Sequence, residues 1–274
     1  MIGAIVGDIL GSTWEFKLEK PQKEPPFFLS DSHITDDSIL TTATAHALLH
    51  KSSFKDAYCS FFKLYTGHNK GMPSAINAGF GGMFVDWALR APEDQHPYFS
   101  YGNGSAMRVS PVGWIANSKE EVLSLALQSS YCTHDHPEGI KGAQSTAMAI
   151  YLARQGMSKK DIFSEITSLF DYPCDLDLDW LHEHYLFNET CPGSLPQAFS
   201  CVYHANSFEE TISNALYIGG DSDTICAIAG SIAEAIWGVP EKMANIALNI
   251  LYKNAPLMAG IVMEFEKRYG NKIC

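Results

Sequence analysis

The sequence predicts an all-α fold, and three observations support this prediction. Apolar residues recur at three- and four-residue spacings through long stretches, which gives a helix one buried face. Residues that favour helix starts and helix ends stand at the borders of these stretches. Runs of alternating apolar and polar residues, which are typical of strands, are almost absent. We therefore expect roughly ten or more helices.

The first helix is expected in the apolar N-terminal stretch, where Gly3, Gly7 and Gly11 recur every four residues and line one face. Each glycine costs about 1 kcal/mol of helix propensity relative to alanine, so a close backbone contact or a site is expected there. Asp8 and Glu15 are seven residues apart, and a helix that carried both would place them on the same face. The alternative is a tightly packed buried helix with one solvated acid at its end.

Periodicity predicts three further helices: Asp36–Lys51, Ser118–Tyr131 and Ser207–Tyr217. The last two open with Ser-x-x-Glu, the pattern of a capping box. Pro240 stands where the first residue of another helix is expected. The glycines expected to end helices are Gly67, Gly156 and Gly270.

The composition predicts one compact globular domain over residues 1–274. Hydrophobic residues make up 46% and charged residues 18%, less than the usual ~25%, and no linker-like segment divides the chain. Only residues 171–196 form an irregular stretch. The net charge of −12 and the lack of a basic run argue against a nucleic-acid partner or an anionic membrane surface.

The cysteines and the apolar segments predict a cytoplasmic protein. The seven cysteines are scattered and form no Cys-x-x-Cys pair, which fits neither a disulfide framework nor a thiolate zinc site. The apolar N-terminus lacks the basic start of a signal peptide and contains Asp8. The segment from Ile225 to Val239 is too short to cross a bilayer.

Two acidic segments of similar composition precede predicted helices: Thr35-Asp36-Asp37-Ser38 and Asp221-Ser222-Asp223-Thr224. Either segment alone is explained by ordinary capping of a helix N-terminus. If both helix starts met, however, four carboxylates could not remain ionised together without cations. Carboxylate and hydroxyl oxygens suit Mg²⁺ or Mn²⁺ and do not suit zinc. The duplicated pattern therefore favours a two-metal hydrolytic site.

A glycine-rich loop, Ser100-Tyr101-Gly102-Asn103-Gly104, is a candidate for binding phosphate oxygens through its backbone amides. Tyr101 offers a flat face for a base or a sugar, and Arg108 adds positive charge. Asn-Gly is also a common turn dipeptide, so an ordinary turn is the alternative. His134 leads into a predicted helix near Pro137, where it is either a structural hydrogen-bond donor or a functional group.

Five motifs in order give the sequence a resemblance to the ADP-ribosylglycohydrolase family, from Gly3 to about Val239. They are GAIVGDILGSTWEF, TDDS, SYGNGSAMRVSP, THDHPEGIKGA and GGDSDTICAIAG. The resemblance implies a compact orthogonal multi-helix all-α domain with a dinuclear Mg²⁺ centre, for which Mn²⁺ is also possible, at the mouth of an ADP-ribose cleft. The second motif has Ser38 where many relatives have Thr, and both side chains keep a hydroxyl.

The resemblance also implies roles for individual residues. The implied metal ligands are Thr35, Asp36, Asp37, Asp221, Asp223 and Thr224. The implied substrate-binding residues are Ser100, Tyr101, Gly102, Asn103, Gly104 and His134. Glu15, Asp36 and Asp223 are the candidates for the general acid and base.

The implied reaction is hydrolysis of the glycosidic bond between ADP-ribose and an acceptor, with oxocarbenium character in the transition state. ADP-ribosylated arginine on a protein is the first expectation. ADP-ribosylserine and O-acetyl-ADP-ribose, or another small ADP-ribose conjugate, are alternatives. Different chemistry also remains open: a two-metal nucleotide diphosphate hydrolase or a non-catalytic ADP-ribose-binding module. The segments expected to select the acceptor are 17–32, 66–84 and 172–196.

Overall fold

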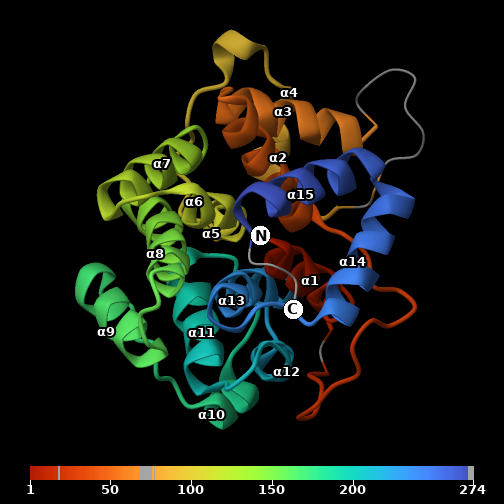
Figure 1. Cartoon of the computed structure of the whole chain (residues 1–274). Coiled ribbons are helices and arrows are strands. Elements are labelled where there is room, and N and C mark those ends of the chain that lie inside the picture. Colours follow the sequence, from red (N-terminus) through yellow and green to blue (C-terminus); the bar gives the residue numbers. More distant parts are fainter. Residues whose placement is uncertain (18, 68–75, 77, 271–274) are drawn as a thin grey trace.

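The computed structural model describes residues 1–17, 19–67, 76 and 78–270. The predicted all-α fold is confirmed: the described residues form fifteen α-helices and one short 3-10 helix, with no strand and a single isolated bridge between Gly102 and Thr190 (Figure 1). The helices are α1 (Ile2–Gly11), α2 (Asp36–His50), α3 (Phe54–Tyr65), α4 (Gly82–Leu89), η1 (Pro92–Asp94), α5 (Gly104–Met107), α6 (Ser110–Ile115), α7 (Lys119–Tyr131), α8 (Pro137–Arg154), α9 (Lys159–Phe170), α10 (Leu178–His184), α11 (Cys191–His204), α12 (Phe208–Ile218), α13 (Ser222–Trp237), α14 (Glu241–Asn254) and α15 (Pro256–Tyr269).

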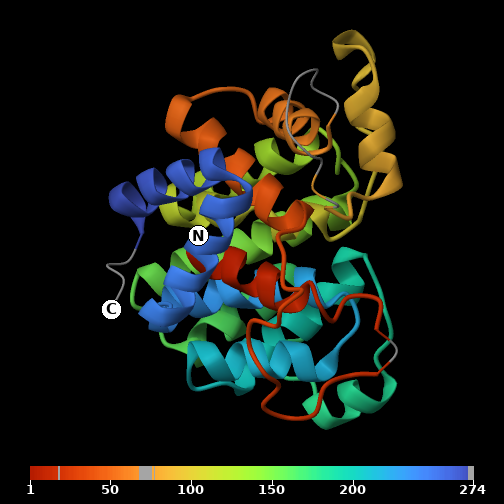
Figure 2. The same cartoon turned by 90° about the vertical axis from the view of Figure 1, so that its right-hand side faces the viewer.

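Helices α1 and α13 form the centre of the protein, with the other helices packed around them (Figures 1 and 2). Helix α13 packs against α1, α8, α11 and α12, and α1 also contacts α2 and α14. Every residue of α1 is buried. Within the described part of the chain, no helix has the length and apolar character needed to cross a membrane. The six described cysteines are free, and Cys274 lies outside the described residues.

The glycines of α1 allow its backbone to touch that of α13, as the spacing predicts. A Cβ added to any of them would lie 2.0–2.4 Å from a backbone oxygen of α13. The pairs are Gly3 with Gly230, Gly7 with Cys226, and Gly11 with Ser222. The steps of four residues run in opposite directions, so the two helices are antiparallel. This register places the end of α1 beside the start of α13.

The structure corrects one expectation about this helix. Helix α1 ends at Gly11, and the Trp14 amide donates to the Gly11 carbonyl oxygen at 2.8 Å, so a turn follows. The Ser12 hydroxyl, which donates to the Ile9 carbonyl, also accepts from the His33 amide at 3.1 Å and ties the turn to the chain ahead of α2. Asp8 and Glu15 therefore do not share a helix face.

The other predicted helix ends agree with the structure to within about one residue. In each predicted capping box the serine hydroxyl accepts from the glutamate amide at 3.1 Å, at Ser118 and Ser207. The glutamate carboxylate, however, bonds to the amide of the asparagine that precedes the serine, at 2.7 Å in both boxes. Pro240 is the cap of α14 and not its first residue. The irregular stretch 171–196 contains α10 and the start of α11.

The predicted glycine stops are found at the ends of three helices. Gly67 and Gly156 follow α3 and α8 with φ of 75° and 79°, a conformation that favours glycine. Gly270 ends α15 with an extended backbone and φ of −70°.

The α1–α13 contact predicts the effect of adding one methyl group. We expect Gly7→Ala to lower the free energy of unfolding by about 1–3 kcal/mol, because the methyl group would overlap the Cys226 backbone. The matched control is Gly260→Ala in α15, where no atom lies within 4 Å of the new Cβ. This control should be neutral or stabilising by up to about 1 kcal/mol. Urea unfolding of both variants measures the difference, and equal effects would contradict the proposed contact.

Candidate active site

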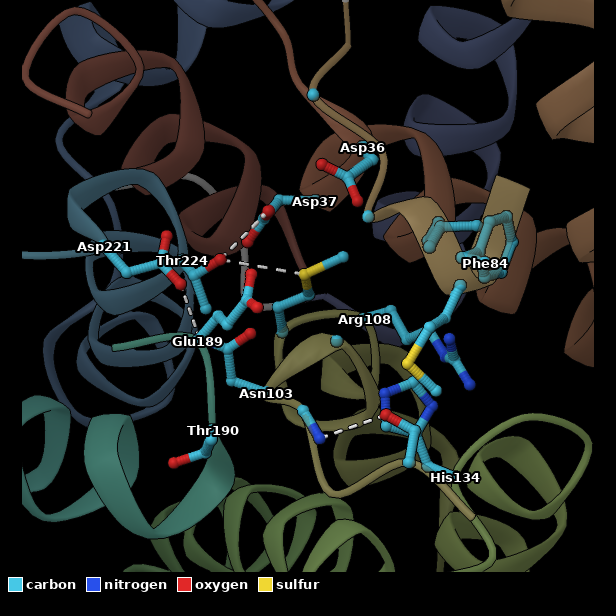
Figure 3. A pocket seen from close by; sticks show the side chains of 18 of the residues that line it. Asp36, Asp37, Phe84, Asn103, Arg108, His134, Glu189, Thr190, Asp221 and Thr224 are labelled. Atoms are coloured by element: carbon cyan, nitrogen blue, oxygen red, sulfur yellow. Dashed lines mark hydrogen bonds between the residues drawn. The ribbon is translucent and has the colours of Figure 1, made fainter. Parts of the chain in front are cut away.

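A pocket of about 410 Å³ opens between the N-terminal ends of α2 and α13 and the loop that precedes α5 (Figure 3). This volume lies within the range of small-molecule sites. Every predicted site residue except Thr35 lines the pocket. Figure 3 shows the acidic residues Asp36, Asp37 and Asp221 toward one end, and Arg108 and His134 toward the other. The pocket therefore has an acidic end and an end that carries a buried cation.

Asp8, which the sequence did not assign to the site, joins α1 to the start of α2. Its carboxylate accepts from the Thr35 hydroxyl at 2.7 Å and from the amides of Thr35 and Ser38, both at 3.1 Å. It also accepts from the Ser38 hydroxyl. Asp8 is fully buried, and its bonds satisfy amide groups at the N-terminus of α2. This contact orients Asp36 and Asp37, which come directly after Thr35.

The structure brings the two predicted acidic segments together. One carboxylate oxygen from each of Glu15, Asp221 and Asp223 can be chosen so that all three lie within 4.8 Å of one another. The Thr224 hydroxyl donates to Asp37 at 3.2 Å and so links the start of α13 to the start of α2. Segments about 185 positions apart in the sequence therefore meet in the structure, which is the condition that a shared metal site requires.

Thr35 differs from the other predicted ligands because it lies behind the pocket wall. Its hydroxyl donates to Asp8 and accepts from the Asp37 amide at 3.3 Å, and its side chain is only 2% exposed. In the structure as described, Thr35 caps α2 and does not line the pocket.

The carboxylates raise one another's pKa values. Burial, and then the charge of Asp223, raise the pKa of Asp8 to about 6 and that of Glu15 to about 9. The same two causes raise the pKa values of Asp36, Asp37 and Asp221 well above the usual value for aspartate. So many acids in one buried place are stable as anions only with a compensating positive charge.

The donor set fits a hard divalent cation. Asp37 Oδ1 is buried and has no hydrogen-bond partner among the described residues. The available ligand atoms are carboxylate and hydroxyl oxygens, which Mg²⁺ and Mn²⁺ prefer. The carboxylates around this orphaned oxygen could hold such an ion, and the structure thus supports an acidic metal site at this end of the pocket.

The loop Ser100–Gly104 lines the pocket, but two of its amides are already bonded within the protein. The Gly102 amide donates to the Ser100 hydroxyl at 3.1 Å, and the Asn103 amide donates to the Glu189 carbonyl oxygen at 2.8 Å. These two amides are therefore not free to bind phosphate oxygens, which corrects the expected role of the loop backbone at Gly102 and Asn103. The Asn103 side chain donates to Asp221 at 2.6 Å, so it connects the loop to the acidic end. Tyr101 is 49% exposed, which leaves its ring accessible to a ligand.

Several pocket residues could not be identified from the sequence. Phe16 and Phe187 line the pocket with ring centroids 5.2 Å apart, although they belong to segments far apart in the chain. Glu189 and Thr190 also line it, and they fall in the expected selectivity segment 172–196. Segment 66–84 contributes Gly79, Gly81, Gly82, Met83 and Phe84, whereas most of 68–77 lies outside the described residues. Among the described residues of 17–32, none lines the pocket. The only sequence indication of Phe16 was its position next to Glu15.

Comparisons with known proteins identify the family to which the chain belongs. A sequence model of the ADP-ribosylglycohydrolase family matches residues 1–256, so the chain belongs to this family of hydrolases. It is 25% identical to ADP-ribosylhydrolase ARH3 of Mus musculus, over 88% of this chain and 83% of that protein. It is 24% identical to ADP-ribosylarginine hydrolase Tri1 of Pseudomonas putida, over 90% of this chain and 73% of that protein. A solved structure of an ADP-ribosylglycohydrolase-related protein complex superposes with a TM-score of 0.68 at 21% identity, covering 97% of this chain and 96% of that chain.

The raised pKa values predict how stability depends on pH and on metal. An acid whose pKa is raised by folding binds its proton more tightly in the folded protein. The free energy of unfolding therefore falls as pH rises from the unfolded pKa (3.8 for Asp8, 4.5 for Glu15) to the folded values of about 6 and 9. In EDTA we expect Tm to fall between pH 5 and pH 9.

Excess Mg²⁺ should reduce this fall in Tm and raise Tm at pH 9 by about 2–4 °C relative to EDTA. Thermal unfolding with and without Mg²⁺ measures the effect. Asp37→Asn should flatten the pH dependence in EDTA, because one of the repelling charges is gone. A Tm in EDTA that does not depend on pH would contradict the account.

Proposed function

We propose that this protein hydrolyses the glycosidic bond that joins ADP-ribose to an arginine side chain and releases free ADP-ribose. The observation that carries the proposal is the convergence of Glu15, Asp221 and Asp223 with Asp37 at one end of a ligand-sized pocket. Membership of the ADP-ribosylglycohydrolase family supports the reaction class. The choice of acceptor is supported by the similarity to ADP-ribosylarginine hydrolase Tri1.

The protein's own residues have separate tasks in this proposal. The residues that would hold two divalent cations, Mg²⁺ or Mn²⁺, are Asp36, Asp37, Asp221, Asp223 and Thr224. When bound, these ions supply positive charge that orients the distal ribose and assists hydrolysis. Thr35 acts from behind by fixing Asp8 and Asp37.

Glu15 is the candidate for moving a proton at the reacting bond. It lines the pocket, lies within 4.8 Å of Asp221 and Asp223, and belongs to a turn rather than to a helix. Its carboxyl group gives a proton to the leaving nitrogen or takes one from the attacking water. Asp36 and Asp223 are the remaining candidates for the second proton transfer.

The other end of the pocket binds the rest of the ligand. Ser100, Tyr101, Gly102 and Gly104 form one wall, against which the diphosphate and the base or sugar rest. The Asn103 side chain bonds this wall to Asp221. A ligand that spans the pocket therefore contacts both the loop and the acidic end to which the loop is bonded. His134 faces the same loop and is proposed to contact a ribose oxygen.

A product assay tests the reaction and the acceptor together. ADP-ribosylated arginine peptide, ADP-ribosylated serine peptide and O-acetyl-ADP-ribose are incubated with the protein in Mg²⁺ or in EDTA, and products are identified by mass spectrometry. We expect free ADP-ribose from the arginine peptide, dependent on metal. Release of ADP-ribose from only the serine peptide or O-acetyl-ADP-ribose would show that arginine is not the acceptor. AMP as the product would indicate a diphosphate hydrolase, and no release despite ADP-ribose binding would indicate a binding module.

The role of Glu15 is tested by one isosteric change. We expect Glu15→Gln to lower kcat/KM by about 10²–10⁴-fold, the usual range for loss of a general acid or base. The matched control is Glu19→Gln, an exposed residue on the same segment that does not line the pocket. Steady-state kinetics with saturating Mg²⁺ compares the two variants. Full activity of Glu15→Gln with metal binding intact would remove Glu15 from the mechanism.

A further inference from the structure

Arg108 is a buried cation with no carboxylate partner among the described residues. Its side chain is 0% exposed, and its guanidinium lies 4.3 Å from the centroid of the Tyr58 ring. One nitrogen, Nη2, donates to the Ser129 carbonyl at 3.1 Å and to the Thr133 hydroxyl at 2.8 Å. Burying an unpaired charge lowers the stability of the folded protein. Because Arg108 lines the pocket, we expect this cost to be offset by a role of Arg108 in the site.

The bond from Arg108 restricts what the Thr133 hydroxyl can do. A hydroxyl group has one proton to donate. Among the described residues, the acceptors bonded to it within 3.5 Å are Nδ1 of His134 at 2.7 Å and the Ser130 carbonyl at 3.5 Å. The Ser130 carbonyl already accepts from the amides of Thr133 at 3.1 Å and His134 at 2.8 Å. The proton of Thr133 is therefore directed to Nδ1 of His134, and donation by Arg108 polarises the hydroxyl in the same direction.

The state of the His134 ring follows from this geometry. When Nδ1 accepts a hydrogen bond in a neutral imidazole, the ring proton is on Nε2. Burial, and then the charge of Arg108, lower the pKa of His134 well below its usual value, so the ring is neutral. Nε2 faces the glycine-rich loop: added Cβ atoms at Gly102 and Gly104 would lie 3.5 Å and 3.4 Å from it.

We propose that Arg108 is a positioning residue that acts through Thr133 to hold His134 as the neutral Nε2–H tautomer. His134 then presents a hydrogen-bond donor, and not an acceptor, to an oxygen of the ligand in the pocket. Figure 3 shows the Arg108 and His134 side chains close together on the side of the pocket away from Asp36 and Asp221. The tautomer assignment rests on the protein geometry alone, whereas the ligand oxygen, in ADP-ribose, rests on the proposed function.

The test is ¹⁵N NMR of histidine-labelled protein, with the His134 signals assigned by comparison with His134→Gln. In the wild-type protein we expect Nδ1 to have the shift of an unprotonated nitrogen and Nε2 that of a protonated nitrogen. In Thr133→Val, which replaces the hydroxyl with a methyl group of similar shape, a substantial population of the Nδ1–H tautomer should appear. Thr133→Ser keeps the hydroxyl and should restore the wild-type signals.

Ligand binding gives the second readout. We expect Thr133→Val to raise the Kd for ADP-ribose by about fivefold to tenfold, the effect of one weakened hydrogen bond, with Thr133→Ser close to wild type. Arg108→Lys keeps the charge but loses the planar donor, and should shift the tautomer population in the same direction as Thr133→Val.

The outcomes separate this inference from the proposed function. A protonated Nδ1 in the wild-type protein, or no change of tautomer in Thr133→Val, would overturn the role of Arg108. If the wild-type protein binds no ADP-ribose, the proposed function fails, while the NMR result still decides the tautomer. Because Arg108 is fully buried, its variant is interpreted only if it folds, and Thr133→Val provides the decision if it does not.

Discussion

The close backbone contact between α1 and α13 is the constraint on which the site depends. Three glycines of α1 lie against backbone oxygens of α13, and this antiparallel register sets the start of α13 beside the end of α1. Asp8, on the same helix, bonds to the start of α2. One short buried helix therefore fixes the positions of both acidic segments, and the turn after it carries Glu15.

The fold places several carboxylates close together at a buried end of the pocket, where their negative charges repel one another. Burial and mutual repulsion raise the pKa values of Glu15, Asp37 and Asp221. Without a metal ion, the ionised forms of these acids therefore destabilise the folded protein. A bound cation would reduce the repulsion between the carboxylates and provide the positive charge that the proposed hydrolysis needs. At the opposite end, hydrogen bonds connect one buried guanidinium, through Thr133, to the ring of His134. The two ends are joined by the bond between Asn103 and Asp221.

Much of the fold and of the site could be predicted from the sequence, because the relevant patterns are local. Helix periodicity, serine caps and the glycine spacing of α1 depend on residues within one or two turns, and two similar acidic segments suggested a common site. The features that the sequence did not predict depend on contacts between segments far apart in the chain. The turn that follows α1 is tied to the chain ahead of α2 by the bond from the His33 amide to the Ser12 hydroxyl. The amides of the glycine-rich loop are engaged partly through Glu189, and the pairing of Phe16 with Phe187 has no local pattern.

The most direct test of the account is anomalous diffraction from crystals grown with Mn²⁺ and ADP-ribose. We expect Mn²⁺ peaks at the acidic end of the pocket, with carboxylate oxygens of both Asp36–Asp37 and Asp221–Asp223 as ligands. Such peaks would show that the starts of α2 and α13 form one metal centre. Mn²⁺ bound to only one of these segments, or found only elsewhere with ADP-ribose in the pocket, would contradict the central claim.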